Sequence, residues 1–297
     1  EKQSIGVAQS NINFNNWFFK NGEAPVIVNN LKTKRTAENL RLYFKTQGYF
    51  NARVSANKDS LKNKKATITY KVTRGNPFFL DTISTRIPSK VLEDLYLKDT
   101  AKTFLNTNDQ YNDQSFINEA NRIIKLYRNS GIYHFSDNHI LFHPDSTRTD
   151  FKTNVLVSIS ETYNKTIQGR NVTKPFQVYT IKEVNVLTDY SYNKEGEVLL
   201  DSVSYNGINF FAHDKVKYNP KYLSQSIFIK PNQTYKDSLR NLTRSHLKSL
   251  KNFKSISIKY EEVENSNSLI ANIKLTPQEK FTIGTESELT HSNIRKL

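Results

Sequence analysis

Two histidines and an aspartate lie close together in the sequence and have the residue types of a metal site. His139 and His143 are separated by three residues, and Asp145 follows. Imidazole and carboxylate groups are common ligands of zinc and related metals. The segment alternates like a β-strand, on which residues 139 and 143 would share a face about 13 Å apart. This separation is too long for one ion, so we expect no metal site.

The other residue types capable of chemistry form no recognisable catalytic motif. The sequence contains no Cys, no G-x-S-x-G, no phosphate-binding or dinucleotide-binding glycine pattern and no H-E-x-x-H. The carboxylate pairs Glu261-Glu262 and Asp109/Asp113 are of a kind that any protein surface supplies. We therefore expect no enzyme and no cofactor.

Charge is high but spread along the chain. The formal net charge is +15, yet the densest basic groups are only Lys32, Lys34 and Arg35, or Lys62, Lys64 and Lys65. A nucleic-acid-binding protein is the alternative of another class, because a basic chain attracts phosphate. Scattered charge is more typical of a solvated surface, so we expect no nucleic acid. The length of 297 residues favours two or three domains.

The elements show a repeated order, first seen in residues 24–76. A short apolar run at 25–28 predicts a strand, and a helical stripe follows plausible N-caps at Thr33 and Thr36. Two alternating runs, 52–56 and 66–72, then predict a hairpin. The predicted order is strand, helix, hairpin.

Residues 77–163 repeat that order. The run from Phe78 to Ile83 predicts a strand, a short helix is expected at 91–97, and a longer helix carries a stripe from Phe116 to Tyr127. Runs at 138–143 and 151–160 predict the closing hairpin.

Residues 176–277 repeat it again. Tyr179-x-Ile181-x-x-Val184 has the spacing of Phe78-x-Leu80-x-x-Ile83, and NQTYKD at 232–237 resembles NDQYND at 108–113. Leucines and isoleucines predict a short helix near Leu223 and Ile227, a longer one from Leu239 to Leu250, and a hairpin at 256–275. Residues 191–220 are expected to be an insertion with its own hairpin at Asn206-Gly207.

Glycine and proline mark the ends of these elements. Gly48 and Gly131 each follow the last apolar residue of a long helix by four positions, and Asn252 takes that place in the third repeat. Gly75 and Pro77 predict one linker, and residues 171–175, ending at Pro175, predict another.

The pattern resembles a known family. LRLYFKTQGYFNARV (40–54) with KATITYKVTRGNPFFLDTI (65–83) is similar to the helix and hairpin of a POTRA domain, as are PKYLSQSIFIKPNQTY (220–235) and LTRSHLKSLKNFKSISIKY (242–260). The resemblance extends over nearly the whole chain and is greatest to lipid-anchored TamA-like proteins (TamL type) of the BamA/TamA superfamily. It implies an α+β fold of three tandem βααββ modules: 24–76, 77–163 and 176–277.

The same resemblance implies a function. Such modules act as a periplasmic scaffold at the bacterial outer membrane, with unfolded outer-membrane protein clients and TamB-like or other envelope assembly factors as partners. A two-partner-type secretion transporter is the alternative within this class. Family members continue into their own membrane β-barrel, and residues 278–297 resemble the start of its first strand. In residues 1–23, Phe14, Trp17, Phe18 and Phe19 are expected to pack on the first module or to lie at a lipid interface.

In the POTRA arrangement the strand after the long helix lies at a sheet edge. The resemblance therefore implies edges at 51–57, 137–143 and 254–261, which can add a strand from another chain. The alternative is an edge that is merely solvated, or guarded by Arg53, Lys254 and Lys259. The residues expected to pair with polypeptide are Ala52, Arg53, Val54, Ser55, Ala56, Ile256, Ser257, Ile258, Lys259 and Tyr260.

Overall fold

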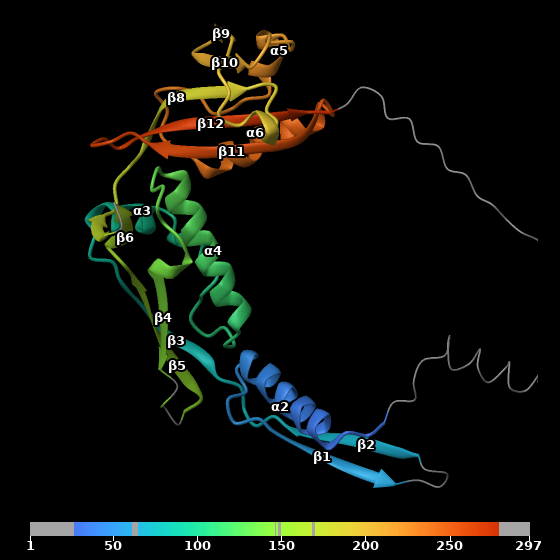
Figure 1. Cartoon of the computed structure of the whole chain (residues 1–297). Coiled ribbons are helices and arrows are strands. Elements are labelled where there is room, and N and C mark those ends of the chain that lie inside the picture. Colours follow the sequence, from blue (N-terminus) through green and yellow to red (C-terminus); the bar gives the residue numbers. More distant parts are fainter. Residues whose placement is uncertain (1–26, 61–64, 146, 148–149, 168–169, 279–297) are drawn as a thin grey trace, which may run out of the picture. The chain divides into compact units, whose positions relative to one another are not determined.

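The computed structural model describes residues 27–278 except 61–64, 146, 148–149 and 168–169 (Figure 1). The fold is α+β. The chain forms two compact units: one takes the described residues up to Thr82 with Asn106–Ser115 and Asp145–Asn154, and the other takes the rest. In the described part of the chain, no helix is long and apolar enough to cross a membrane.

The N-terminal hairpin unit consists of one helix and two strands: α2 (Asn30–Thr46), β1 (Arg53–Ser60) and β2 (Ala66–Thr73). The cap of α2 is Asn29, whose Oδ1 accepts hydrogen bonds from Leu31 N (2.9 Å) and Lys32 N (3.2 Å). The expected caps Thr33 and Thr36 were wrong, since an equally good acceptor starts the helix one turn earlier.

The strand expected at 25–28 is also not found. Ile27 and Val28 have no strand partner, and Ile27 is exposed. Pro25 and Val26 lie outside the described residues. A short apolar run without a partner cannot satisfy its backbone groups as a strand.

The middle module has the order strand, helix, helix, strand, strand. Its elements are β3 (Phe79–Arg86), α3 (Lys90–Lys98), the 3₁₀ turn η1 (Thr100–Lys102), α4 (Asp113–Asn129), the 3₁₀ turn η2 (Asp137–His139), β4 (Ile140–Asp145) and β5 (Lys152–Ile159). The sheet order is β3-β5-β4. Phe116, Ile123 and Tyr127 are buried along α4, as the apolar stripe predicts.

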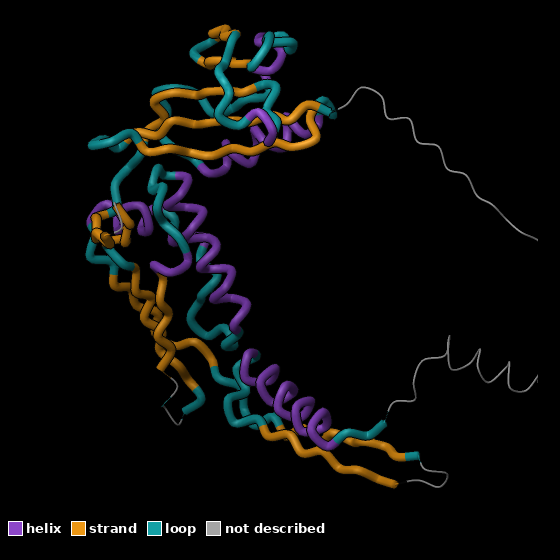
Figure 2. Tube along the Cα trace, in the orientation of Figure 1, coloured by secondary structure: helices purple, strands orange, loops and turns teal. Residues whose placement is uncertain are grey.

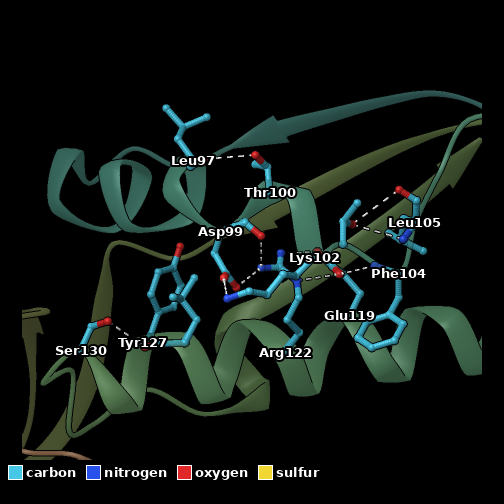
Figure 3. A network of polar contacts seen from close by, with 12 residues as sticks. Leu97, Asp99, Thr100, Lys102, Phe104, Leu105, Glu119, Arg122, Tyr127 and Ser130 are labelled. Carbon is cyan, nitrogen blue, oxygen red and sulfur yellow. Dashed lines mark hydrogen bonds and ion pairs between the residues drawn. The ribbon is translucent and has the colours of Figure 1, made fainter.

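A buried ionic network connects α4 to the turn that follows α3 (Figure 3). Glu119 is fully buried and accepts from Arg122 Nη2 at 2.6 Å and from Phe104 N at 2.9 Å. Arg122 Nη1 also donates to Asp99 Oδ2 at 2.8 Å. With every charged group paired, the network fixes residues 99–105 on the helix.

A second hairpin joins the middle module to the C-terminal one. It consists of β6 (Thr162–Ile167) and β7 (Arg170–Pro175), which pair antiparallel from Thr162↔Pro175 onward. Residues 171–175, expected to form a linker, are therefore a paired strand within this connection. Thr and Val favour an extended strand here, and Pro175 is tolerated at the end of β7.

The C-terminal module repeats the middle one with an added hairpin. Its elements are β8 (Thr180–Leu187), the 3₁₀ turn η3 (Tyr192–Lys194), β9 (Asp201–Tyr205), β10 (Ile208–Ala212), α5 (Pro220–Gln225), α6 (Asp237–Ser249), β11 (Phe253–Glu262) and β12 (Ser268–Pro277). Asn206 and Gly207 have φ of 50° and 74°, as a tight hairpin turn requires.

The insertion enlarges the sheet to five strands in the order β11-β12-β8-β10-β9 (Figure 1). Strand β8 is parallel to both β12 and β10. On the face of the sheet away from the buried core, four polar side chains form a row: Asn272 accepts from Asn185, Asn185 from Asn209, and Asn209 from Ser204.

The other face of this sheet carries the core. Val184, Val186, Phe210, Tyr235 and Leu247 are fully buried there, and burying each such side chain stabilises the fold by about 1.5–3 kcal/mol. Figure 2 shows α6 running along β11. The leucine stripe predicted for α6 is only partly buried, since Leu242 and Leu250 are exposed.

Candidate functional site

The sequence predicts that the edge strands of the sheets bind polypeptide. In the N-terminal hairpin unit, Arg53, Val54, Ser55 and Ala56 lie in β1, whereas Ala52 precedes the strand and is buried. Within the described residues, β1 pairs only with β2, in register from Arg53↔Thr73 to Ser60↔Ala66. Both strands therefore keep one edge unpaired.

Strand β11 lies at the edge of the five-stranded sheet and contains all five C-terminal residues of the prediction. Ile256, Ile258 and Tyr260 pair with Leu275, Ile273 and Ala271 of β12 and share the core side of the sheet. Ser257 and Lys259 point to the other side, since side chains alternate along a strand. The strand thus has one apolar and one polar flank.

Strand β4 is the third expected edge, and it ends the order β3-β5-β4. Its Ile140 is buried, and Phe142 packs on Phe116 with ring centroids 5.3 Å apart. The insertion creates a further edge at β9, which the three-stranded expectation did not include.

Two junctions, each following a long helix, have the same backbone hydrogen bonds. In the first, Phe78 N donates to Gly48 O (2.9 Å) and Tyr111 N donates to Phe78 O (2.8 Å). In the second, Tyr179 N donates to Gly131 O and Tyr235 N to Tyr179 O, both at 2.9 Å.

The resemblance between NDQY and NQTY explains the next pair of bonds. Asn108 N donates to Leu80 O at 2.8 Å, and Asn232 N to Ile181 O at 2.7 Å. Asn108 and Asn232 both have positive φ, 70° and 60°. The repeat seen in the sequence is therefore a repeat of backbone geometry.

Glycine is needed at both junctions because another segment comes close. Gly48 has a φ of 84°, and a Cβ there would lie 2.7 Å from Tyr111 O. Gly131 has a φ of 98°, and a Cβ there would lie 2.6 Å from Val178 Cγ1 and 2.8 Å from Thr234 Cγ2. Gly75, with φ of 74°, and Pro77 lie between β2 and β3.

The third helix end differs from the prediction. Helix α6 ends at Ser249, and the residue with positive φ is Lys251 (55°), not Asn252. The buried Leu247 precedes Lys251 by four positions, the spacing that Tyr127 has to Gly131. Asn tolerates positive φ and is therefore favoured by the sequence at position 252, but the helix ends one residue earlier than a cap at that position requires.

An ion pair strengthens the second junction. Arg128 Nη2, near the end of α4, lies 3.0 Å from Asp237 Oδ1 at the start of α6, and Nη1 donates to Tyr133 O at 2.9 Å. Burial opposes ionisation of Asp237, but hydrogen bonds from Arg128 and Tyr235 hold its pKa below the ordinary value.

Glu262, the last residue of β11, is held by three side chains, which we call the clasp. Lys165 Nζ of β6 lies 2.6 Å from Oε2, Tyr179 OH donates to Oε2 at 3.2 Å, and His134 Nε2 lies 3.1 Å from Oε1. Burial opposes the charge of Glu262, yet Lys165 and His134 keep its pKa lowered. Burial also lowers the pKa of His134, despite the nearby carboxylate.

Aromatic rings surround the clasp. The His134 ring stacks on Tyr163 at 4.1 Å and 11°, and Tyr163 stacks on Phe176 at 5.4 Å. Tyr133 contacts Tyr260 of β11 edge-on at 5.9 Å. These contacts fix one end of β11 to the β6–β7 hairpin and to the loop after α4.

A groove of about 750 Å³ opens beside the clasp. Its walls are the β6–β7 hairpin and the turn between β11 and β12, with Lys165, Lys174, Glu262 and Glu264 among the lining residues. Charges of both signs and amide groups make this groove polar, and Glu262 at the end of β11 is one of its lining residues.

The histidines considered for a metal site have other roles. His139 lies in η2 rather than on a strand, and its Nδ1 accepts from Ser136 N at 3.1 Å, while His143 lies on β4. Over the described ranges, no three His, Cys, Asp or Glu side chains gather as metal ligands. Phe14, Trp17, Phe18 and Phe19, and residues 279–297 of the expected barrel strand, lie outside the described residues.

Comparisons with known proteins leave the family open. No protein-family profile and no curated protein matches the chain. Among solved structures it is similar to POTRA3-5 of BamA from Haemophilus influenzae, with 13% identity over 82% of this chain and 79% of that chain, and a TM-score of 0.43.

It is also similar to Haemophilus ducreyi BamA lacking POTRA domains 1–3, with 8% identity over 68% of this chain and 29% of that one (TM-score 0.43). The N-terminal domain of Omp85 from Thermosynechococcus elongatus matches with 13% identity over 87% and 88% (TM-score 0.30). Scores below 0.5 do not assign a family, so the functional argument rests on the geometry.

Proposed function

We propose that this chain is the periplasmic arm of an outer-membrane protein assembly factor and binds extended polypeptide by adding a strand to β11. The observation that carries the proposal is the edge of β11, a ten-residue strand on a sheet with its own core, with which no other strand of the described residues pairs. Main-chain groups along such an edge bind another strand largely regardless of its sequence. The βααββ order of the middle and C-terminal modules supports the POTRA-type reading.

The two flanks of β11 select the kind of client. An added strand would have one set of side chains beside Ile256 and Tyr260 and the other beside Ser257 and Lys259. Strands destined for a membrane barrel alternate between apolar and polar residues, which fits both flanks. Unfolded outer-membrane proteins are therefore the clients we propose, on the periplasmic side of that membrane.

The N-terminal edge is a second, weaker candidate in the same proposal. Among the strands that the structure describes, β1 pairs with β2 alone, and none of the residues of α2 is buried. A two-stranded sheet holds its edge less firmly than a five-stranded one. We propose that β1 contacts a TamB-like or other assembly partner, whereas β11 receives clients.

Single-cysteine crosslinking tests the proposal, because the chain contains no Cys. Two variants of the chain are made, Ser257→Cys and Lys259→Cys, both on β11. Each variant is mixed with an unfolded barrel segment that carries one Cys, and disulfide formation is measured. We expect crosslinks that peak at one client position for each site. Hydrogen exchange with the unmodified segment should show new protection along residues 253–262.

Ser204→Cys on β9, the opposite edge of the same sheet, is the matched control. Equal crosslinking at Ser204 and Ser257 would show nonspecific contact and would overturn the proposal. Loss of the crosslinks when a short DNA duplex is added, with a steep dependence on salt, would favour the nucleic-acid alternative.

A further inference from the structure

A groove of about 590 Å³ lies along one face of α4, beside the turn that follows α3 (Figure 3). Helix positions three or four apart share a face, and six such residues of α4 line the groove: Asn118, Asn121, Arg122, Lys125, Leu126 and Asn129. Phe104 of the turn also lines it and is 48% exposed. Leu126 and Phe104 therefore give the groove an apolar surface that is open to water.

The charges that line this groove are mainly basic. Among its described lining residues, Lys102, Arg122 and Lys125 are cations and Asp99 is the one acid. Even with the buried Glu119, which pairs with Arg122, the cations are in excess. Lys125 is exposed and, in the described part of the chain, forms no ion pair. An acidic side chain from a partner would therefore meet an unpaired cation here.

A loop of the C-terminal module carries the opposite charge. Residues 195–201 read Glu-Gly-Glu-Val-Leu-Leu-Asp and contain no basic residue, and we call them the acidic loop. Every residue from 195 to 200 is exposed, Val198 by 76% and Leu200 by 73%. Glu197 forms no ion pair with any other described residue, whereas the preceding Lys194 lies 3.6 Å from Asp214. Because these residues are consecutive, acidic and apolar side chains follow one another along a single exposed stretch of chain.

The acidic loop is held at both ends and has an open middle. Glu195 lies 2.9 Å from Lys274 Nζ, and Leu200 N donates to Ala212 O at 3.1 Å. Residues 197–200 have neither helix nor strand structure. Between the two anchors, Val198 and Leu199 remain in contact with water, which is unfavourable for aliphatic side chains.

We propose that the acidic loop of one copy of this chain binds in the α4 groove of a second copy. In this contact Glu197 pairs with Lys125, while Val198 and Leu200 leave water and pack against Phe104. Within one described chain the loop and the groove are both open to water, so the partner comes from another molecule. Strand β11 takes no part in the contact, so this inference goes beyond strand addition and does not depend on it.

Two properties set the strength of this contact. The net charge of +15 repels copies at long range. At physiological salt the Debye length is about 8 Å, so distant charges are screened more strongly than a partly buried pair. A single loop in a groove belongs with the interfaces that bury less than about 1,200 Å², which are weak. We therefore expect association at high protein concentration and moderate salt.

Two variants that each lose one half of the contact test the inference. The loop variant carries Val198→Asp and Leu200→Asp, and the groove variant carries Phe104→Asp and Lys125→Glu. Sedimentation velocity should show association of the unmodified chain that increases with concentration, whereas either variant alone stays monomeric. An equal mixture of the two should form dimers, because one variant supplies an intact loop and the other an intact groove.

The circular dichroism spectra of both variants should match that of the unmodified chain. An unmodified chain that is monomeric at every concentration, or a mixture that sediments no faster than its components, would overturn the inference. Association of either variant by itself would also overturn it, because another surface would then be responsible.

An exchange of charges tests the ion pair separately. Glu197→Lys and Lys125→Glu should each weaken association at least about tenfold, because the new side chain then meets a like charge. Both changes in one chain should restore most of the association, because the pair forms again with its signs reversed. Lys182→Glu, at an exposed position of β8, changes the net charge as Lys125→Glu does and should not weaken association.

A double variant that associates no better than either single variant would overturn the inference, as would equal weakening by Lys182→Glu. None of these changes lies on β11. Hydrogen exchange along residues 253–262 with an added client segment therefore reports on strand addition independently of the contact between copies.

Discussion

The first junction surrounds its glycine with amide and aromatic side chains, whereas the second adds charge. Beside Gly48, Gln110 Nε2 donates to Gln47 O at 2.7 Å, and Phe50 packs on Phe78 at 4.9 Å. Beside Gly131, Arg128 pairs with Asp237, and the clasp holds Glu262. The same backbone geometry thus has two different side-chain environments. Glycine and the Asn-x-x-Tyr segment thus define a junction, while the surrounding side chains decide how its stability depends on pH.

The largest expected effect comes from adding a methyl group at the junctions. Gly48→Ala should destabilise the first junction by about 3 kcal/mol, because the new Cβ meets a backbone oxygen and φ is positive. Gly131→Ala should cost less, since Val178 and Thr234 side chains can shift. Hydrogen exchange at Phe78 N and Tyr179 N measures both.

Gly196→Ala is the matched control, because its φ is also positive and the space around it is open. It should cost only about 1 kcal/mol, the strain of the backbone alone. A loss at Gly48 no larger than at Gly196 would show that close approach is not what requires the glycine.

The ion pair of the second junction has the next largest effect. Arg128→Met should destabilise this junction by about 2 kcal/mol, because Asp237 loses a partly buried partner. Lys45 occupies the same place, three residues before Gly48, so Lys45→Met is the control and should change stability by less than about 0.5 kcal/mol. Amide exchange at Tyr179 and at Phe78 distinguishes the two. Equal losses would mean that the junctions do not differ in charge.

Acid should loosen the second junction in two stages. The folded pKa of His134 is below its ordinary 6.5, so protonation favours the unfolded chain and stability falls as pH drops below about 6.5. The pKa values of Glu262 and Asp237 are also lowered. Their contribution to the stability of the fold is therefore lost at a lower pH, below the ordinary pKa values of 4.5 and 3.8.

The midpoint temperature of unfolding should therefore be lower at pH 5 than at pH 7. It is measured by near-ultraviolet circular dichroism of the tyrosine cluster. His134→Phe should remove that first stage and keep the second. If the midpoint temperature of the variant decreased between pH 7 and pH 5 as much as that of the unmodified chain, His134 would be ruled out as the group responsible.

The smallest expected effect tests the third helix end. Lys251 has a φ of 55°, so Lys251→Gly should stabilise the C-terminal module by about 1 kcal/mol. Asn252→Gly, one residue later, should not stabilise it. The measurement is the exchange rate of amides in α6 and β11. If Asn252→Gly stabilised the module instead, position 252 would be the cap of α6, as the sequence predicts.

Much of the fold follows from local patterns in the sequence. Alternating apolar and polar residues predicted the hairpins, and the apolar stripe predicted the long helix α4. The Asn206-Gly207 pair predicted the turn in the insertion. Each of these signals depends on neighbouring residues alone. The βααββ order of the two later modules follows from these elements. The edge position of β11 came from the family resemblance and not from any pattern in the strand itself.

The missed features depend on partners distant in the sequence. Glu119 and Arg122 belong to residue types that usually face solvent, yet they are buried because Asp99 and the Phe104 amide pair with them. Parallel pairing of β10 with β8 leaves no trace in either strand. The clasp at Glu262 needs His134 and Lys165 from two other segments, and Glu261-Glu262 alone looked like an ordinary surface pair.

The parallel pairing of β8 with β12 has a mechanical consequence. The chain enters the C-terminal module at the start of β8 and leaves it at the end of β12, and these strands are neighbours. Tension between the two ends therefore pulls the strands past each other lengthwise, so that all their hydrogen bonds carry load together instead of opening one at a time. A module with this strand connectivity transmits tension along the chain while its sheet stays intact.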